Sequence, residues 1–178
     1  LVSDPSSYLI LGQRLAAGSG YQSATALVFN LGRAFNGQPL IHVPATAFYP
    51  PGYPAFIAAV LWVTQHTPLP DGDQTRAVGF VQAILGTVTV GLAFLIARRV
   101  FDARVALVAA AVVAFTPNLI ATTATLQLET FFVSLAMLAV LMLLPVVATE
   151  RPSTVRLVAA SAFLGLVALV RPTIAMLL

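Results

Sequence analysis

Residues 105–149 read VALVAAAVVAFTPNLIATTATLQLETFFVSLAMLAVLMLLPVVAT, and Glu129 is the only charged residue among them. The uncharged run on each side of Glu129 is long enough to cross a bilayer, because about 20 apolar residues span a hydrocarbon core about 30 Å thick. A carboxylate near membrane depth is costly unless it faces water, a partner or a substrate. Glu129 is therefore a candidate functional residue. The alternative is a charge that caps a helix at the membrane surface.

The composition is that of a multi-span membrane protein. Hydrophobic residues make up 59% of the chain and charged residues 8%, whereas soluble domains average about 25% charged residues. The nine basic residues are all arginines, scattered singly or in pairs among apolar runs. That scatter differs from the basic patch of a nucleic-acid-binding protein. We expect an all-α fold of polytopic membrane helices, with an external loop that carries interfacial helices.

Cysteine is absent, which excludes disulfides, thiolate catalysis and cysteine-based zinc sites. His42 and His66 are the only histidines and lie too far apart to form a metal-binding motif. No cofactor is expected. A divalent metal has little support, since hard cations need several oxygen ligands and the expected outer side offers few acids.

Four membrane helices are expected, at about residues 77–97, 105–125, 131–148 and 157–178. Arginines cluster after the first and third of these segments, at residues 98–104 and 151–156. By the positive-inside rule both clusters are cytoplasmic, which places Glu129 on the outer face.

The first 75 residues then form an external loop, and residues 76–178 form part of a longer membrane domain. The chain begins without an initiator methionine and ends within an apolar stretch. We therefore expect a further membrane helix before it and a C-terminal remainder after it in the complete protein.

Two surface helices are expected in the external loop. Residues 53–63 are strongly apolar but too short to span, and a crossing there would turn both arginine clusters outward. They are interpreted as an interfacial or re-entrant helix. Residues 6–17 form the second helix. Asp4 and Pro5 suit its start, so Asp4 can be explained as a helix cap.

The expected topology also gathers charges of opposite sign on the outer side. From residue 157, about 14 residues at about 1.5 Å each carry Arg171 about 21 Å along its helix, into the outer half of the membrane. A guanidinium stays charged and presents a fork of donors that suits phosphate oxygens. The alternatives for Arg171 are a salt bridge to Glu129 and a helix end whose side chain snorkels to the surface.

Five sequence blocks, taken in order, resemble a known family. They are SDPSSYLILGQRLAAGSGY (3–21), PATAFYPPGYPAF (44–56), LIARRVFDARVALVAAAVVAFTPN (95–118), LQLETFF (126–132) and ALVRPT (168–173). Their succession resembles the GT-C membrane glycosyltransferases of the dolichyl-phosphate-mannose protein mannosyltransferase type, which include bacterial glycosyltransferase family 39 and 83 members.

The resemblance implies roles for five residues of this chain. Asp4 corresponds to the acid of the first external loop, the usual candidate for the base that activates the acceptor. Glu129 corresponds to the acid of the second external loop. Tyr49 and Tyr53 lie in a segment that borders the donor phosphate, although the lysine found there in aminoarabinose transferases is missing. Arg171 corresponds to a basic residue near the same phosphate.

The activity implied is transfer of a hexose or pentose, with inversion, from a polyprenyl-phosphate donor to a protein, lipid or glycan acceptor. It would take place on the extracytoplasmic face of a bacterial inner membrane, with membrane lipid as a partner and no nucleic acid. The residue types agree, because a carboxylate can act as general base while a cation stabilises the departing phosphate. The 178 residues alone are expected to be inactive.

Two other classes remain open. A transporter or channel segment would place broken helices near the bilayer midplane, and Pro117, Asn118 and Pro145 could break theirs. Internal repeats, which are common in transporters, are not apparent, and the ionisable residues gather at the two faces. The other class is an inactive fragment or structural subunit.

Overall fold

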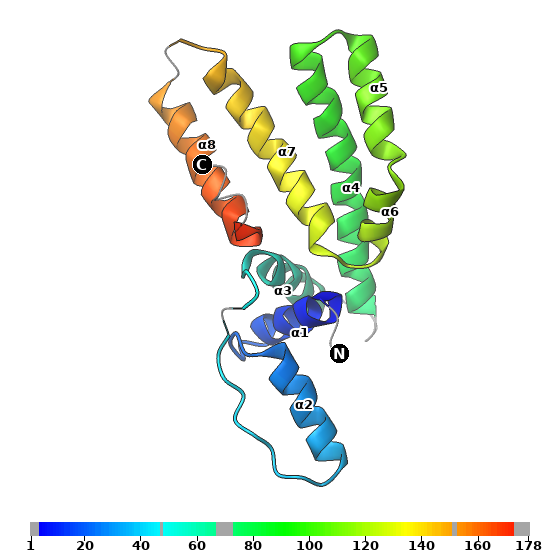
Figure 1. Ribbon diagram of the computed structural model, residues 1–178, viewed down its shortest axis with the longest axis vertical. Coiled ribbons are helices and arrows are strands. Elements are labelled where there is room, and N and C mark those ends of the chain that lie inside the picture. Colours follow the sequence, from blue (N-terminus) through cyan, green and yellow to red (C-terminus); the bar gives the residue numbers. More distant parts are fainter. Residues whose placement is uncertain (1–3, 47, 67–72, 151–152, 173–178) are drawn as a thin grey trace. The chain divides into compact units, whose positions relative to one another are not determined.

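The computed structural model describes residues 4–46, 48–66, 73–150 and 153–172 (Figure 1). Within these ranges it contains eight α-helices and no strand apart from an isolated bridge between Gln22 and Ala45. The all-α polytopic class is thereby confirmed. The helices are α1 (Asp4–Ala16), α2 (Ala24–Phe35), α3 (Gly52–Gln65), α4 (Asp73–Val100), α5 (Ala103–Ala114), α6 (Pro117–Ala124), α7 (Leu128–Val147) and α8 (Thr154–Val170).

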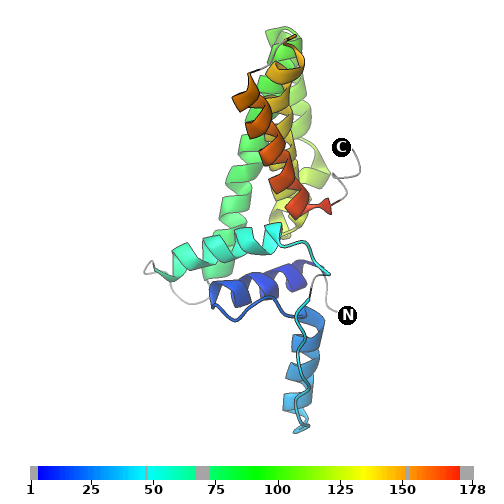
Figure 2. The same cartoon turned by 90° about the vertical axis from the view of Figure 1, so that its left-hand side faces the viewer.

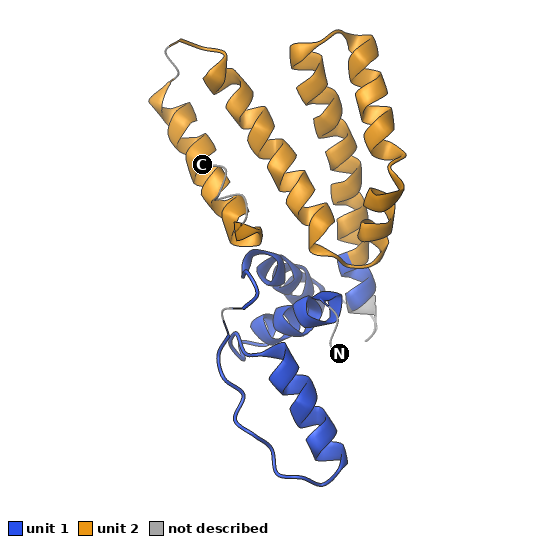
Figure 3. Cartoon of the chain, in the orientation of Figure 1, with its two compact units in different colours: residues 1–78 blue, residues 79–178 orange. Residues whose placement is uncertain are grey.

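The chain divides into two compact units, Leu1–Val78 and Gly79–Leu178 (Figure 3). The sequence predicts a boundary between an external loop and a membrane part a few residues earlier, after residue 75. The interpretation of the first unit as an external loop stays a prediction.

The first unit is built on the packing of α1 against α3, which lie side by side in Figures 1 and 2. Leu11 from α1 and Tyr53, Ile57 and Leu61 from α3 are buried in this contact. Their spacing on α3 is four residues, so they line one face of the helix. Gly12 allows the close approach, because a Cβ built there would lie 2.7 Å from Ile57 Cβ.

Both helices expected in this region are present, with slightly different ends. The predicted helix over residues 6–17 is α1, which begins at Asp4, so Asp4 lies in its first turn. The predicted helix over residues 53–63 is α3, which is longer by one residue before it and two after. Their placement at the membrane surface stays a prediction.

Helix α2 is absent from the sequence-based expectation. It begins after Ser23, whose side chain accepts a hydrogen bond from the backbone N–H of Ala26 at 3.3 Å, as an N-cap does. The chain then returns beside α2 in extended form, held by the side chain of Asn30. The Asn30 amide donates to the Ile41 carbonyl at 2.7 Å and accepts from the Ile41 N–H at 2.9 Å.

In the second unit, α4 and α7 are long and apolar enough to cross a membrane by themselves. Helices α5 and α6 meet this criterion only as a pair, bent by 48° at the residues before Pro117. Proline lacks the N–H of a helical hydrogen bond and restricts the residue before it, which explains a break here. The described part of α8 is a shorter apolar helix.

The expectation of four crossings stays a prediction, since residues 173–178 of the last segment lie outside the described residues. Helix α8 ends at Val170, and Arg171 follows it with φ −145° and ψ 103°. The residue before a proline avoids the α-helical region, so Pro172 explains why Arg171 lies just past the helix and not within it.

Candidate functional site

The first group of candidate residues lies at the start of α1. The hydroxyl of Tyr49 donates to Oδ1 of Asp4 at 3.3 Å and lies 3.2 Å from Oγ of Ser7. Asp4 and Ser7 are three residues apart, so both lie on the same face of α1. Asp4 is exposed and Ser7 is fully buried. The structure thus joins two segments that are 45 residues apart in the chain.

Aromatic rings surround this hydrogen-bonded group. The ring of Tyr8 meets those of Tyr49 and Tyr53 edge to face, at centroid distances of 5.1 and 5.2 Å. Tyr53 is fully buried, so its ring belongs to the packing between α1 and α3. The assignment of Tyr49 and Tyr53 to the donor phosphate stays a prediction.

A further tyrosine holds the loop that carries Tyr49. The Tyr21 hydroxyl donates to the backbone carbonyl of Tyr49 at 2.9 Å. Burial raises the pKa of the Tyr21 hydroxyl to about 12, with a further contribution from Tyr8 and Tyr49. Tyr21 therefore stays protonated and keeps its role as a donor at neutral pH. Sequence reasoning missed this residue, and its place at the end of the first resembling block was the available signal.

Glu129 lies in the second unit, in the first turn of α7. The preceding turn places Leu126 at φ +52°, in the left-handed region that non-glycine residues seldom adopt. The fully buried Gln82 of α4 donates to the carbonyl of Gln127 at 2.8 Å and thereby fixes this turn. A carboxylate is also favourable at a helix N-terminus, so Glu129 has a structural explanation as well as a functional one.

Arg171 lies close to the same end of α7. Its guanidinium lies over the ring of Phe132, 5.5 Å from the centroid. Phe132 is three residues after Glu129, which places the two on one face of α7. An aromatic ring can hold a cation in this way, so Phe132 explains the position of the guanidinium without an ion pair. Arg171 is exposed and directly follows the end of α8, so the helix end that snorkels to the surface stays an alternative.

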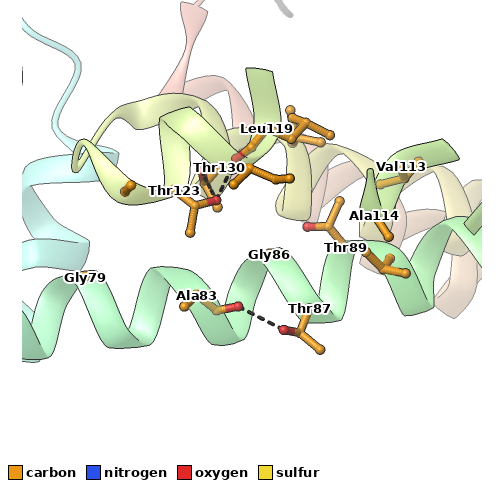
Figure 4. Close-up of a pocket in the computed structure, with 14 residues that line it drawn as sticks. Gly79, Ala83, Gly86, Thr87, Thr89, Val113, Ala114, Leu119, Thr123 and Thr130 are labelled. Atoms are coloured by element: carbon orange, nitrogen blue, oxygen red, sulfur yellow. Dashed lines mark hydrogen bonds between the residues drawn. The ribbon is translucent and has the colours of Figure 1, made fainter. Parts of the chain in front are cut away.

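A cavity of about 700 Å³ lies between α4, the bent α5 and α6 pair, and α7 (Figure 4). Small residues of α4, among them Gly79, Ala83 and Gly86, form one wall. Thr123 and Thr130 bond to each other at 3.1 Å on the opposite side, as Figure 4 shows. The lining is suited to apolar groups and offers a few hydroxyls at its edge.

The structure thus brings together Asp4, Tyr49 and Tyr53 in the first unit, and Glu129 and Arg171 in the second. Among the described residues, no group of three or more histidine, aspartate or glutamate side chains is arranged to hold a metal ion. In each unit, the candidate residues come from different helices or loops.

Helices α4 and α7, which are long and apolar enough to cross a membrane, define the class of the protein: a helical membrane protein. The family described as dolichyl-phosphate-mannose-protein mannosyltransferase matches residues 49–178, which is more than half of the chain. The chain belongs to this family, and is thus a membrane glycosyltransferase of the GT-C type. No curated protein and no solved structure matches it.

The family implies a lipid-linked sugar donor and an acceptor. Tyr49, Tyr53, Glu129 and Arg171 lie within the matched residues, and Asp4 lies before them. The packing of α1 against α3 and the hydrogen bond from Tyr49 connect Asp4 to the matched part of the chain.

Proposed function

We propose that this protein transfers a sugar from a polyprenyl-phosphate donor to an acceptor on the outer face of the membrane, with inversion at the anomeric carbon. The observation that carries the proposal is the hydrogen bond between Tyr49 and Asp4, which places an exposed carboxylate beside the loop where the family match begins. A general base must lie within hydrogen-bond reach of the proton that it accepts, and Asp4 is open to an acceptor.

Asp4 accepts the proton of the acceptor hydroxyl in this reaction. The acceptor oxygen forms a bond to the anomeric carbon as the bond from that carbon to the phosphate oxygen breaks, and the electron pair leaves with the phosphate. A single displacement of this kind inverts the anomeric centre and requires no nucleophile from the protein.

Arg171 stabilises the phosphate that departs. Its guanidinium carries a permanent charge and five donors, and stacking on Phe132 leaves the edge of the guanidinium plane available. Glu129, one turn away on α7, orients the acceptor or the sugar.

The outer-face orientation rests on the arginines that follow α4. Arg98, Arg99 and Arg104 are exposed around the short connection to α5. The positive-inside rule places this connection in the cytoplasm. The start of α7 then lies at the opposite face, together with Glu129.

The test is sugar transfer by the complete protein in membranes, from a panel of radiolabelled polyprenyl-phosphate sugars. Asp4→Asn and Arg171→Ala are each expected to lower transfer by at least about 100-fold at unchanged protein levels, as loss of a general base or of a charged donor does. Matched controls are Asp102→Asn, which keeps a good N-cap for α5, and Arg98→Ala in the same connection. Both controls should retain transfer.

Full transfer by Asp4→Asn would show that Asp4 is not the base. Asp4 would then have only a structural role in the first turn of α1. Loss in Arg98→Ala equal to that in Arg171→Ala would show a general effect of charge and not phosphate binding. Absence of transfer from every donor in the wild type would favour the transporter class, for which the bend between α5 and α6 is the relevant feature.

A further inference from the structure

We infer that Tyr49 is a positioning residue for Asp4, and not a ligand of the donor phosphate. This inference rests on the proposed function, because it assigns Tyr49 a role through the proposed base. It also changes the role that the resemblance implies for this tyrosine.

The Tyr49 hydroxyl has a single proton for two neighbouring oxygens. The hydroxyl lies 3.3 Å from Oδ1 of Asp4 and 3.2 Å from Oγ of Ser7. A phenol has one proton to donate, and it can accept a second hydrogen bond. Asp4 and Ser7 are its two acceptors in the protein, and a charged acceptor gains more from that proton than a neutral hydroxyl does. No proton of Tyr49 is then left for a phosphate oxygen.

Tyr49 is itself held in place by its neighbours. Its backbone carbonyl accepts the hydrogen bond from Tyr21, and its ring meets Tyr8 edge to face. Pro50 and Pro51 follow directly, and each fixes its own φ. A donor on so constrained a residue holds its acceptor in one orientation, which is what a positioning residue requires.

One carboxylate oxygen of Asp4 remains free to act as the base. The hydrogen bond from Tyr49 reaches Oδ1, so Oδ2 is left to accept the proton of the acceptor hydroxyl. Asp4 is exposed while Ser7 and Tyr8 behind it are buried. The carboxylate is thus fixed from the protein side and open on the solvent side.

The main experiment is the kinetic analysis of Tyr49→Phe in the complete protein. The variant keeps the ring and its contact with Tyr8 but lacks the hydroxyl. We expect kcat to fall about tenfold, since a displaced catalytic group costs about this much or more, while KM for the polyprenyl-phosphate sugar stays within twofold. Thr25→Ala, which removes an exposed hydroxyl of α2 in the same unit, should change neither value.

A rise in donor KM at unchanged kcat would identify Tyr49 as a phosphate ligand and overturn the inference. An unchanged kcat and KM would overturn it as well. Should Tyr49→Phe fail to accumulate, a fluorotyrosine at position 49 keeps the shape and makes the hydroxyl more acidic. We then expect kcat to change at least about twofold at constant donor KM, and a constant kcat would count against the positioning role.

Asp4→Asn separates this inference from the proposed function. Full transfer by Asp4→Asn would remove the proposed base, and the positioning role would fall with it. Loss of transfer in Asp4→Asn together with wild-type kinetics in Tyr49→Phe would leave the proposed function standing and refute only the inference about Tyr49.

Discussion

The α1 and α3 pair in the first unit and the contact between α4 and α7 in the second differ in the largest side chain that each buries. Tyr53 is the largest fully buried side chain of the first pair, whereas Gln82 is the largest of the second. The hydroxyls of Thr89 and Ser134 meet between α4 and α7 at 2.7 Å. Apolar burial drives association in water, but in lipid the helices gain more from close packing and polar contacts.

Helices α4 and α7 expose several large apolar side chains, among them Phe80, Ile84, Val88 and Val140. Such a surface is suited to lipid, where the polar groups have to be satisfied inside. In the α1 and α3 pair, Tyr8 and Tyr53 are buried, whereas Asp4 and Trp62 are exposed. Substitutions at the two contacts should therefore act by different mechanisms.

The largest effect is expected from Gly12→Ala in the α1 and α3 contact. The added Cβ would lie 2.7 Å from Ile57 Cβ and 3.3 Å from the Pro54 carbonyl oxygen, so the helices would have to separate. We expect the free energy of unfolding to fall by about 1–3 kcal/mol, as overpacking does. Denaturant unfolding of the complete protein, followed by Trp62 fluorescence, measures it.

Gly32→Ala in α2 is the matched control, since a Cβ there meets nothing within 4 Å. It should stabilise the protein by up to about 1 kcal/mol, because alanine is a better helix former than glycine. Equal effects of the two substitutions would contradict close packing at Gly12.

Gln82→Met should have the next largest effect, and it acts on the polar contact of the second unit. The variant removes the donor to the Gln127 carbonyl while keeping the length of the side chain. Loss of a partner for a buried polar group costs about 1–3 kcal/mol. Thermal unfolding in detergent should show it, and Gln65→Met at an exposed position of α3 should not. A stable Gln82→Met protein would mean that the turn before α7 is fixed without this bond.

Ser134→Ala should have a smaller effect, because Thr89 keeps a hydrogen bond to the Leu85 carbonyl at 2.8 Å. Interhelical hydrogen bonds in membranes contribute about 0.6 kcal/mol on average, and we expect a loss of that size. Thr87→Ala on the exposed side of α4 serves as control, since its hydroxyl bonds only within its own helix, to Ala83. A loss above about 2 kcal/mol would show that this contact behaves like one in water.

A further effect concerns pH and tests the polar edge of the first unit. The pKa of Tyr21 is raised to about 12 in the folded protein, against about 10 in an unfolded chain. Unfolding therefore releases a proton between these values, and stability falls as the pH rises from about 10 to about 12. The measurement is the alkaline unfolding of the wild type and of Tyr21→Phe. The variant should lack this part of the pH dependence, and an identical pH dependence would contradict burial of the hydroxyl.

Sequence reasoning succeeded where a pattern is local. The uncharged runs on both sides of Glu129 predict helices, although the run before Glu129 forms two helices, α5 and α6, bent by 48°. The helix at residues 53–63 follows from a short apolar run, and the helix at residues 6–17 follows from apolar spacing. It failed at α2, whose apolar positions Val28, Leu31 and Phe35 have the right spacing but stay exposed. Glycine and proline residues nearby favoured a loop, whereas the Ser23 cap and the hydrogen bonds of Asn30 stabilise the helix.

The end of α8 is a second place where the structure differs from the prediction made from the sequence. Counting residues along the expected helix places Arg171 within it, but the proline that follows ends α8 at Val170. The cation then turns to Phe132 of α7 instead of forming an ion pair with Glu129. Helix packing decides whether the guanidinium contacts an aromatic ring or a carboxylate. The spacing of residues in the sequence does not reveal this.

The sequence by itself determined the class of this protein, because hydropathy, arginine position and the order of five blocks are properties of the chain. Family membership and the candidates Asp4, Glu129 and Arg171 follow from it. Only the tertiary structure decided that the Tyr49 hydroxyl meets Asp4 and that Gln82 fixes the turn before Glu129. A hydrogen bond between residues 45 positions apart depends on how helices pack, and packing is set by the summed contacts of many residues.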